Sequence, residues 1–186
     1  SSNKNDILTR FFETGVMKLK QTIKTVSPSM DIQVSSNFER LLYDYSKSTE
    51  LIKNLYRDLG MKGYFSVDTK LLDLMKNSFR YGRLNDKETL TSINKIFKRF
   101  RIIIDPHTAV GYSIGKTVLD DSEKRIYLAT AHYSKFIDTV KKVINDQVTL
   151  PERISSIINK EEKFDLLENN LKELIQYITE KSCVSR

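Results

Sequence analysis

Apolar residues recur at helical spacing along most of this chain, and polar residues fill the positions between them. The spacing predicts helices at 7–13, 38–45, 49–59, 67–79, 86–100, 108–119, 134–144 and 164–178, with a short helix starting at Pro151. In the segment 86–100 the apolar stripe consists of Leu90, Ile93, Ile96, Phe97 and Phe100. We expect these stripes to form the core of a mostly helical protein.

Residues at the expected helix ends support these boundaries. Gly15 and Gly60 suit the end of a helix, because glycine takes the left-handed backbone conformation at little cost. Ser66, Asn85 and Asp105 precede apolar stripes and can accept hydrogen bonds from the free N–H groups of a first helical turn. These residues predict separate helices joined by short connections.

The spacing changes at two places in the second half of the chain. Residues 101–104 form a β-branched run before Asp105 and Pro106, and residues 125–131 form a second extended run. A strand, a helix and a strand in this order predict a short βαβ unit that contributes to a sheet. The expected fold class is therefore α/β, with most residues in helices.

The order of elements also predicts how the chain divides. We expect one domain at 1–150, made of a helical insertion at about 31–100 and the βαβ unit at about 101–145. Residues 151–186 are expected to form a helical tail. No internal repeat or low-complexity segment interrupts this order.

Composition and charge exclude several classes of function. The net charge of +7 suggests nucleic acid as a partner, but lysines and carboxylates alternate along the whole chain, so we expect no nucleic-acid binding. No apolar run approaches 18 residues and no secretory signal is visible, so no membrane association is expected. The single cysteine, Cys183, fits a reducing compartment and predicts a cytoplasmic protein.

Two short segments place candidate ligand-binding groups after the predicted strands. His107 and Thr108 follow the first strand at a helix N-terminus, where anions are favoured; the alternative is a capped helix with a surface histidine. Thr130, His132 and Lys135 follow the second strand, and a hydroxyl, an imidazole and an ammonium suit an anionic ligand; the alternative is an ordinary connecting loop.

Other kinds of site are not indicated. His107 and His132 have no cysteine or carboxylate at metal-ligand spacing, so no metal site is expected. The glycines at 111 and 115 are too close together for a phosphate-binding P-loop, and they fall inside a predicted helix. No Gly-x-Ser-x-Gly segment for a serine hydrolase is present.

Several runs of residues resemble the C-terminal part of threonine synthase. The matching runs, in the family's order, are Asn5–Leu8 with Arg10–Gly15, Ser27–Arg40, Asp105–Gly111 and Leu128–Phe136. The run Ser-Pro-Ser-Met-Asp-Ile-Gln-Val-Ser-Ser-Asn-Phe-Glu-Arg is long and unusual. The resemblance extends from the first residues to about residue 150 and is weaker beyond.

The resemblance implies a pyridoxal-phosphate enzyme of fold type II. Such an enzyme is a lyase that converts O-phospho-L-homoserine and water to L-threonine and phosphate, in threonine biosynthesis. By similarity, Thr130 is expected to face the ring nitrogen of the cofactor. The residues expected to contact substrate are Ser36, Asn37, Arg40, His107, His132 and Lys135.

The chain departs from the family pattern in two ways. Tyr133 and Ser134 stand where the family has Pro-Ala, which implies a reshaped loop. The family's cofactor lysine lies in a Phe-Lys-Asp segment that does not occur here, and the glycine-rich phosphate loop is also absent. We therefore expect a fragment without catalytic residues, which does not bind the cofactor alone and is inactive.

Two alternatives stay open at this stage. Beside the inactive fragment, the chain could be a non-catalytic interaction or remnant protein, or one subunit of a split enzyme whose complementing N-terminal half is a separate chain. The predicted strands at 102–104 and 126–129 would then have unpaired edges, so self-association is expected.

Overall fold

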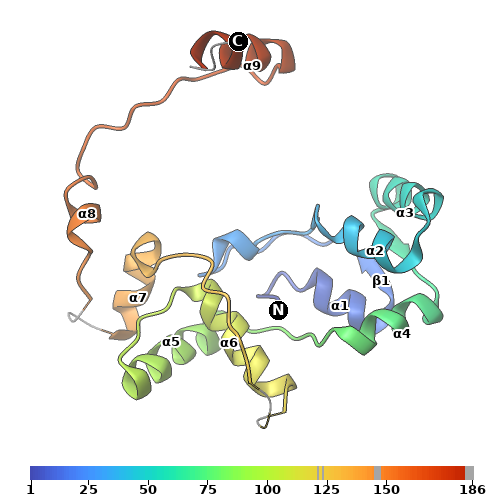
Figure 1. The fold of residues 1–186 in the computed structure, drawn as a ribbon, viewed down its shortest axis with the longest axis horizontal. Coiled ribbons are helices and arrows are strands. Elements are labelled where there is room, and N and C mark those ends of the chain that lie inside the picture. Colours follow the sequence, from blue (N-terminus) through green and yellow to red (C-terminus); the bar gives the residue numbers. More distant parts are fainter. Residues whose placement is uncertain (121, 123, 145–147, 183–186) are drawn as a thin grey trace. The chain divides into compact units, whose positions relative to one another are not determined.

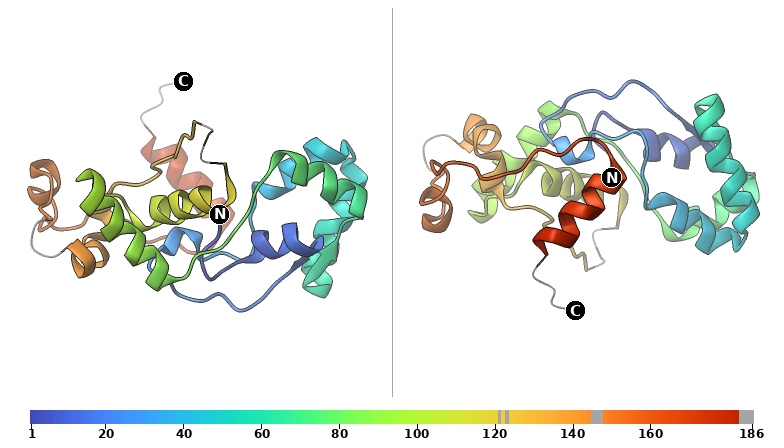
Figure 2. Two further views of the ribbon diagram at one scale, coloured as in Figure 1. Left: turned by 90° about the horizontal axis from the view of Figure 1, so that it is seen from below. Right: turned by 90° about the horizontal axis from the view of Figure 1, so that it is seen from above.

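The computed structural model describes residues 1–120, 122, 124–144 and 148–182. The chain forms two compact units, residues 1–150 (unit 1) and 151–186 (unit 2). Within unit 1, the helices within residues 7–78 gather at one end and those within residues 86–144 at the other (Figures 1 and 2). Cys183, on which the expectation of a reducing compartment rests, lies outside the described residues.

The first end of unit 1 combines four helices with a small antiparallel sheet. The helices are α1 (Ile7–Thr14), α2 (Phe38–Ser46), α3 (Thr49–Lys62) and α4 (Thr69–Ser78). Strand β1 (Val16–Lys18) pairs with β2 (Tyr64–Ser66), with Met17 opposite Phe65. Each strand has three residues, too few for an alternating pattern to predict from sequence.

Phe11 lies at the centre of the core of this end and is fully buried. Its ring meets those of Phe12, Phe38 and Phe65 edge-on, with centroids 5.6, 4.9 and 6.2 Å away. Edge-to-face contacts of this kind are favourable because the positive ring edge meets the negative ring face. The cluster joins α1, α2 and β2.

The second end of unit 1 packs three helices around a separate core. These are α5 (Asp86–Phe100), α6 (Pro106–Val118) and α7 (Ile137–Ile144), which is preceded by the 3₁₀ turn Tyr133–Phe136. The buried core residues are Ile93, Ala109, Val140, Ile144 and Val148. The stripe predicted on 86–100 is correct for Ile93 and Ile96, whereas Phe100 at its end stays 47% exposed.

Of the five residues expected at helix ends, three are confirmed and two are wrong, and the helix expected at 164–178 is found at Leu171–Lys181. Asn85 and Glu88 form a reciprocal capping box, Asp105 caps α6, and Gly15 ends α1 with a φ of 74°. Helix α3 continues past Gly60 and ends at Gly63, where φ is 76°.

The second wrong boundary is the N-terminus of α4. Ser66 belongs to strand β2, and Asp68 caps the helix by accepting a hydrogen bond from the N–H of Leu71. Pairing of β2 with β1 takes Ser66 out of the expected helical pattern.

The two strands of the predicted βαβ unit are not formed. Residues 101–104 and 124–130 are irregular, without a strand partner among the described residues. Ile126 is 91% exposed and Leu128 is 78% exposed. A β-branched run becomes a strand only when a neighbouring backbone satisfies its N–H and C=O groups.

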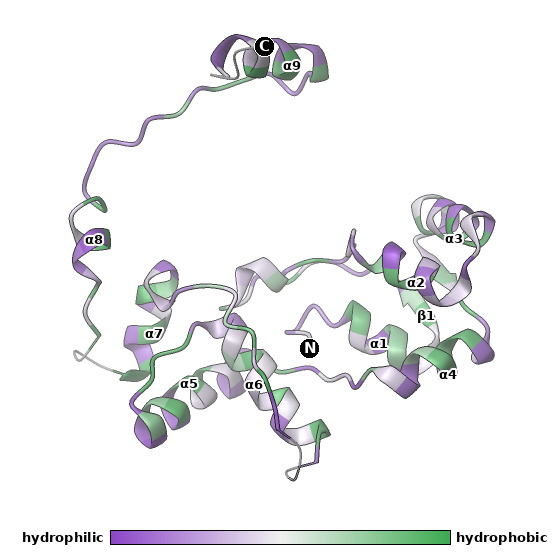
Figure 3. Ribbon diagram, in the orientation of Figure 1, coloured by the Kyte–Doolittle hydropathy of each residue, from purple (hydrophilic) through white to green (hydrophobic). Residues whose placement is uncertain are grey.

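Unit 2 contains α8 (Glu152–Ser155) and α9 (Leu171–Lys181). None of its described residues is buried. Figure 3 shows hydrophobic and hydrophilic residues alternating along α9, and the hydrophobic Leu171, Leu174, Ile175 and Ile178 are all exposed. Among the described residues of the whole chain, no helix is long and apolar enough to cross a membrane.

Candidate functional site

A buried hydrogen-bond network fixes the loop that carries the Ser27–Arg40 run. The side-chain amide of Asn3 donates to the Thr25 hydroxyl at 2.7 Å and to Asp31 Oδ1 at 2.8 Å. The Asn5 amide also donates to Asp31 Oδ1, at 2.9 Å. Asn3, Asn5, Thr25 and Ser27 are at most 9% exposed. Because buried polar groups are costly when unpaired, this dense pairing holds the loop in one conformation.

His107 joins three of the sequence runs that carry the resemblance, which are, in order, Ser27–Arg40, Asp105–Gly111 and Leu128–Phe136. The backbone N–H of Ser29, in the first run, donates to His107 Nε2 at 3.1 Å. His107 Nδ1 lies 2.7 Å from Asp105 Oδ1 within the second run. The ring of Phe136, at the end of the third run, packs with its centroid 4.7 Å from that of the imidazole. Segments far apart along the chain therefore meet at one side chain.

These contacts define the tautomer of His107. A backbone N–H can only donate, so Nε2 must accept, and the ring proton resides on Nδ1 and points to the Asp105 carboxylate. Both ring nitrogens are thus used inside the protein, and the side chain is only 7% exposed. His107 is positioned as a structural junction between loops.

Asp105 is the anionic centre of this junction. Burial opposes the ionisation of its carboxyl, but hydrogen bonds from the side chains of His107 and Thr108 and from the His107 N–H outweigh it and lower the pKa of Asp105. Its Oδ1 also caps α6 by accepting from the His107 N–H at 2.9 Å. One carboxylate therefore holds both the helix N-terminus and the imidazole.

The other predicted site residues lie on exposed segments. Ser36 and Asn37 precede α2, and Thr130 lies in the irregular segment before the 3₁₀ turn; all three side chains are exposed. His132 accepts from the N–H of Ser134 and lies 2.8 Å from its hydroxyl, and Lys135 is exposed within the same turn. The structure brings His107 together with the third run through Phe136 and not through Thr130.

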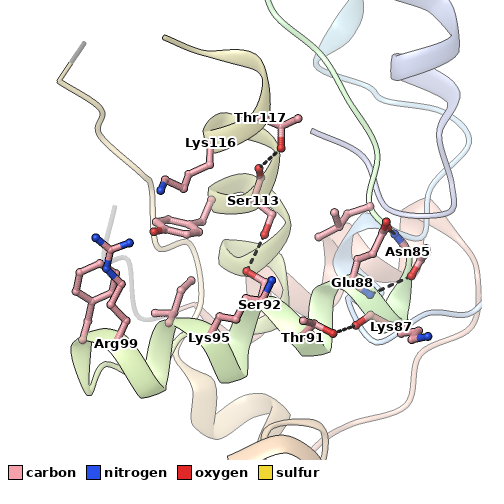
Figure 4. Close-up of a pocket in the computed structure, with 14 residues that line it drawn as sticks. Asn85, Lys87, Glu88, Thr91, Ser92, Lys95, Arg99, Ser113, Lys116 and Thr117 are labelled. Atoms are coloured by element: carbon pink, nitrogen blue, oxygen red, sulfur yellow. Dashed lines mark hydrogen bonds between the residues drawn. The ribbon is translucent and has the colours of Figure 1, made fainter. Parts of the chain in front are cut away.

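Two cavities open on unit 1, and their linings differ in character. A cavity of about 450 Å³ between α2 and α3 is lined by Arg40 together with Glu39, Tyr43, Thr49, Ile52, Lys53 and Tyr56. Burial, with a smaller contribution from Glu39, raises the pKa of Tyr56 to about 12. A larger cavity lies between α5 and α6 (Figure 4). Of the predicted site residues, Arg40 alone lines either cavity.

A metal ion and pyridoxal phosphate each require particular side chains from the protein. No group of three metal-ligating side chains gathers within the described parts of the chain. Thr130 offers a neutral hydroxyl of the kind that suits the cofactor ring nitrogen. Covalent attachment, however, needs a desolvated lysine, and among the described lysines Lys76 alone is even half-buried. No lysine in the described part of the chain meets this requirement.

The network of Asn3, Asn5 and Asp31 was missed by sequence reasoning. The sequence offers Asn5 or Asp6 as the cap of the first helix; the N-cap of α1 is Asp6, and the Asn5 amide donates to Ile23 O at 2.8 Å. The available signal was the concentration of small polar residues around Ser27, which suggests a hydrogen-bonded loop rather than a surface turn.

Solved structures of known proteins share the fold of this chain over almost its whole length. A crystal structure of pyridoxal-phosphate-bound threonine synthase from Brucella melitensis superimposes with a TM-score of 0.86 at 33% identity, over 99% of this chain and 40% of that one. The structure from yeast gives a TM-score of 0.80 at 32% identity, over 96% of this chain and 40% of that one. The fold is that of the fold-type-II pyridoxal-phosphate enzymes.

Sequence comparisons identify the family of this chain within the fold-type-II pyridoxal-phosphate enzymes. A family model described as "Threonine synthase, C-terminal" matches residues 108–178. Threonine synthase of Saccharomyces cerevisiae is 31% identical over 97% of this chain and 40% of its own length. That of Pseudomonas aeruginosa is 31% identical over 97% and 39%. The chain belongs to the threonine synthase family, and it spans about 40% of the length of these relatives.

Proposed function

We propose that this chain is the C-terminal part of a threonine synthase. The whole enzyme would release the γ-phosphate of O-phospho-L-homoserine and add water to the remaining carbon skeleton, giving L-threonine and inorganic phosphate. Pyridoxal phosphate, when bound, supplies the electron sink for this chemistry. The superposition on the Brucella enzyme over almost the entire chain is the observation that supports the proposal most directly.

Within this proposal the chain supplies one wall of the site. The hydroxyl of Thr130 would donate a hydrogen bond to the cofactor ring nitrogen. Thr130 is exposed in this structure, so its hydroxyl is accessible. Of the six residues predicted from the resemblance to contact substrate, five would hold it directly: Ser36, Asn37, Arg40, His132 and Lys135. His107 would act as a positioning residue, because both of its ring nitrogens are already bonded.

The isolated chain is proposed to be inactive, since no described lysine is buried as covalent attachment requires. The test is to incubate it with pyridoxal phosphate and O-phosphohomoserine. We expect no phosphate release and no shift of the cofactor's visible absorbance. Turnover at a rate comparable to that of a family enzyme would refute this part of the proposal.

A second candidate is one subunit of a split enzyme, favoured by the exposure of Ile126 and Leu128 on a segment that pairs with no strand among the described residues. The test is to add the part of the Brucella enzyme that this chain does not match and to measure phosphate release. Thr130→Val should lower any restored rate about tenfold or more, Thr130→Ser should retain it, and the exposed Thr179→Val should leave it unchanged. Equal rates for all three would remove Thr130 from the site.

A further inference from the structure

The groove between α5 and α6 has a volume of about 680 Å³ and is the larger of the two cavities described above. Helix α5 forms one wall and α6 the other (Figure 4). Hydroxyl groups lie along its middle, cationic and aromatic side chains gather at one end, and the capping box of α5 lies at the other. The groove therefore has distinct polar, cationic and aromatic sections.

Three cations line the groove, and two of them, Arg99 and Lys116, lie toward one end of it (Figure 4). Lys95 and Arg99 come from α5 and Lys116 from α6, and all three are exposed. Within the described part of the chain, none of them pairs with a carboxylate. Glu88, the single acidic residue of the lining, is bonded to the Asn85 N–H and lies about 16 Å along the helix from Arg99. Uncompensated cations beside a low-dielectric wall attract anions.

Aromatic side chains border the same end. Phe100 is 47% exposed, although it belongs to the apolar stripe of α5, and the Arg99 guanidinium lies 5.0 Å from the centroid of its ring. Tyr112 projects from α6, and its ring packs against that of Tyr127 with centroids 4.9 Å apart. These rings offer an apolar surface beside the cations, onto which a flat ligand can pack.

The middle of the groove presents hydroxyl groups. The Ser113 hydroxyl donates to the Ser92 hydroxyl at 2.6 Å, so Ser92 keeps its own proton for donation. Ser92 is 7% exposed, and its position on the groove floor is fixed by this bond between α5 and α6. A polar ligand in the groove would meet a preformed donor here.

We propose that this groove binds a small phosphorylated aromatic compound of about the size of a nucleoside monophosphate. The phosphate would lie between Arg99 and Lys116, where charge-assisted hydrogen bonds are strongest. The aromatic ring would pack on Phe100 and Tyr112, and polar groups between them would meet Ser92. The groove is separate from the proposed catalytic wall, because neither Thr130 nor the residues predicted to hold substrate line it.

The test is calorimetric titration of the 186-residue chain with adenosine monophosphate, inorganic phosphate and adenosine. We expect the nucleotide to bind at least about tenfold more tightly than either part alone. Arg99→Gln combined with Lys116→Gln should weaken nucleotide binding at least about tenfold. Phe100→Ala should weaken binding of the nucleotide but leave the affinity for phosphate unchanged.

Two control variants test whether binding takes place in the groove. Lys70→Gln removes an equivalent exposed charge on α4 outside the groove and should leave binding unchanged. Thr130→Val should also leave it unchanged, so failure here is distinct from failure of the proposed function. Equal affinities for nucleotide and phosphate, equal losses with Lys70→Gln, or no binding would each overturn the proposal.

Discussion

At the level of single residues, His107 and Asp105 determine how the runs shared with the family are held together. The histidine accepts from the Ser29 N–H and donates to a carboxylate that also caps α6. Two loops and one helix N-terminus thus depend on a single pair of side chains. The sequence predicted that His107 contacts substrate; its burial and its two internal bonds support a positioning role instead.

Asp105→Asn is expected to lower the free energy of unfolding by about 1–3 kcal/mol, because the buried donors of His107 and Thr108 lose their carboxylate. Since the pKa of Asp105 is lowered in the folded state, its contribution is fully present above the unfolded pKa near 3.8. It is lost as pH falls through the folded value. Urea unfolding between pH 2 and pH 7, roughly the range over which carboxylates titrate, measures both effects.

The matched control for this prediction is Asp138→Asn, at a position on α7 outside the junction. We expect it to change the free energy of unfolding by less than about 0.5 kcal/mol at neutral pH. Equal acid sensitivity of the wild-type chain and Asp105→Asn would contradict the role assigned to the carboxylate.

Among the elements, the helices follow from their own sequence and the strands do not. Asp86–Phe100 forms the helix that its stripe and its capping residue predict. Residues 101–104 and 124–130 have the composition of strands, yet remain irregular because strand formation needs a second backbone at hydrogen-bonding distance. The exposed Ile126 and Leu128 are the consequence.

This exposed segment predicts self-association. Replacing both Ile126 and Leu128 by aspartate should shift the chain toward smaller species, because charge opposes pairing of exposed apolar edges. The free energy of unfolding should change by about 0.5 kcal/mol or less, since neither side chain is buried. Light scattering and urea unfolding check these two results.

Met61→Asp on α3 serves as the control, because Met61 is 78% exposed like Leu128 but lies in a helix. It should leave the particle size unchanged. A wild-type chain that scatters as a monomer at all concentrations would contradict the prediction.

Across the chain as a whole, the two units differ in how much of each is buried. Unit 1 has two hydrophobic clusters, whereas no described residue of unit 2 is buried. Apolar burial is the main favourable term in folding, so almost all of the stability should reside in unit 1. The domain at 1–150 expected from sequence stays a prediction. The difference in burial between the two units gives a way to test it.

Deleting residues 151–186 should leave the free energy of unfolding within about 1 kcal/mol of the full chain, since no described side chain in this segment is buried. A peptide of residues 151–186 should show little helix alone, because α9 has 11 residues and isolated helices of that length are marginal in water. Thermal unfolding and circular dichroism measure these quantities. A large loss of stability on deletion would show that unit 2 packs on unit 1.

The helices, most of their caps and the family could be predicted from the amino-acid sequence, because periodicity, capping and motif order are local properties of the chain. Three features became visible only in the folded chain: the β1–β2 pairing, the buried network around Asn3 and Asp31, and the junction at His107. Each depends on groups far apart in sequence. A hydrogen bond needs its donor and acceptor at one place in space, and only folding puts Ser29 beside His107.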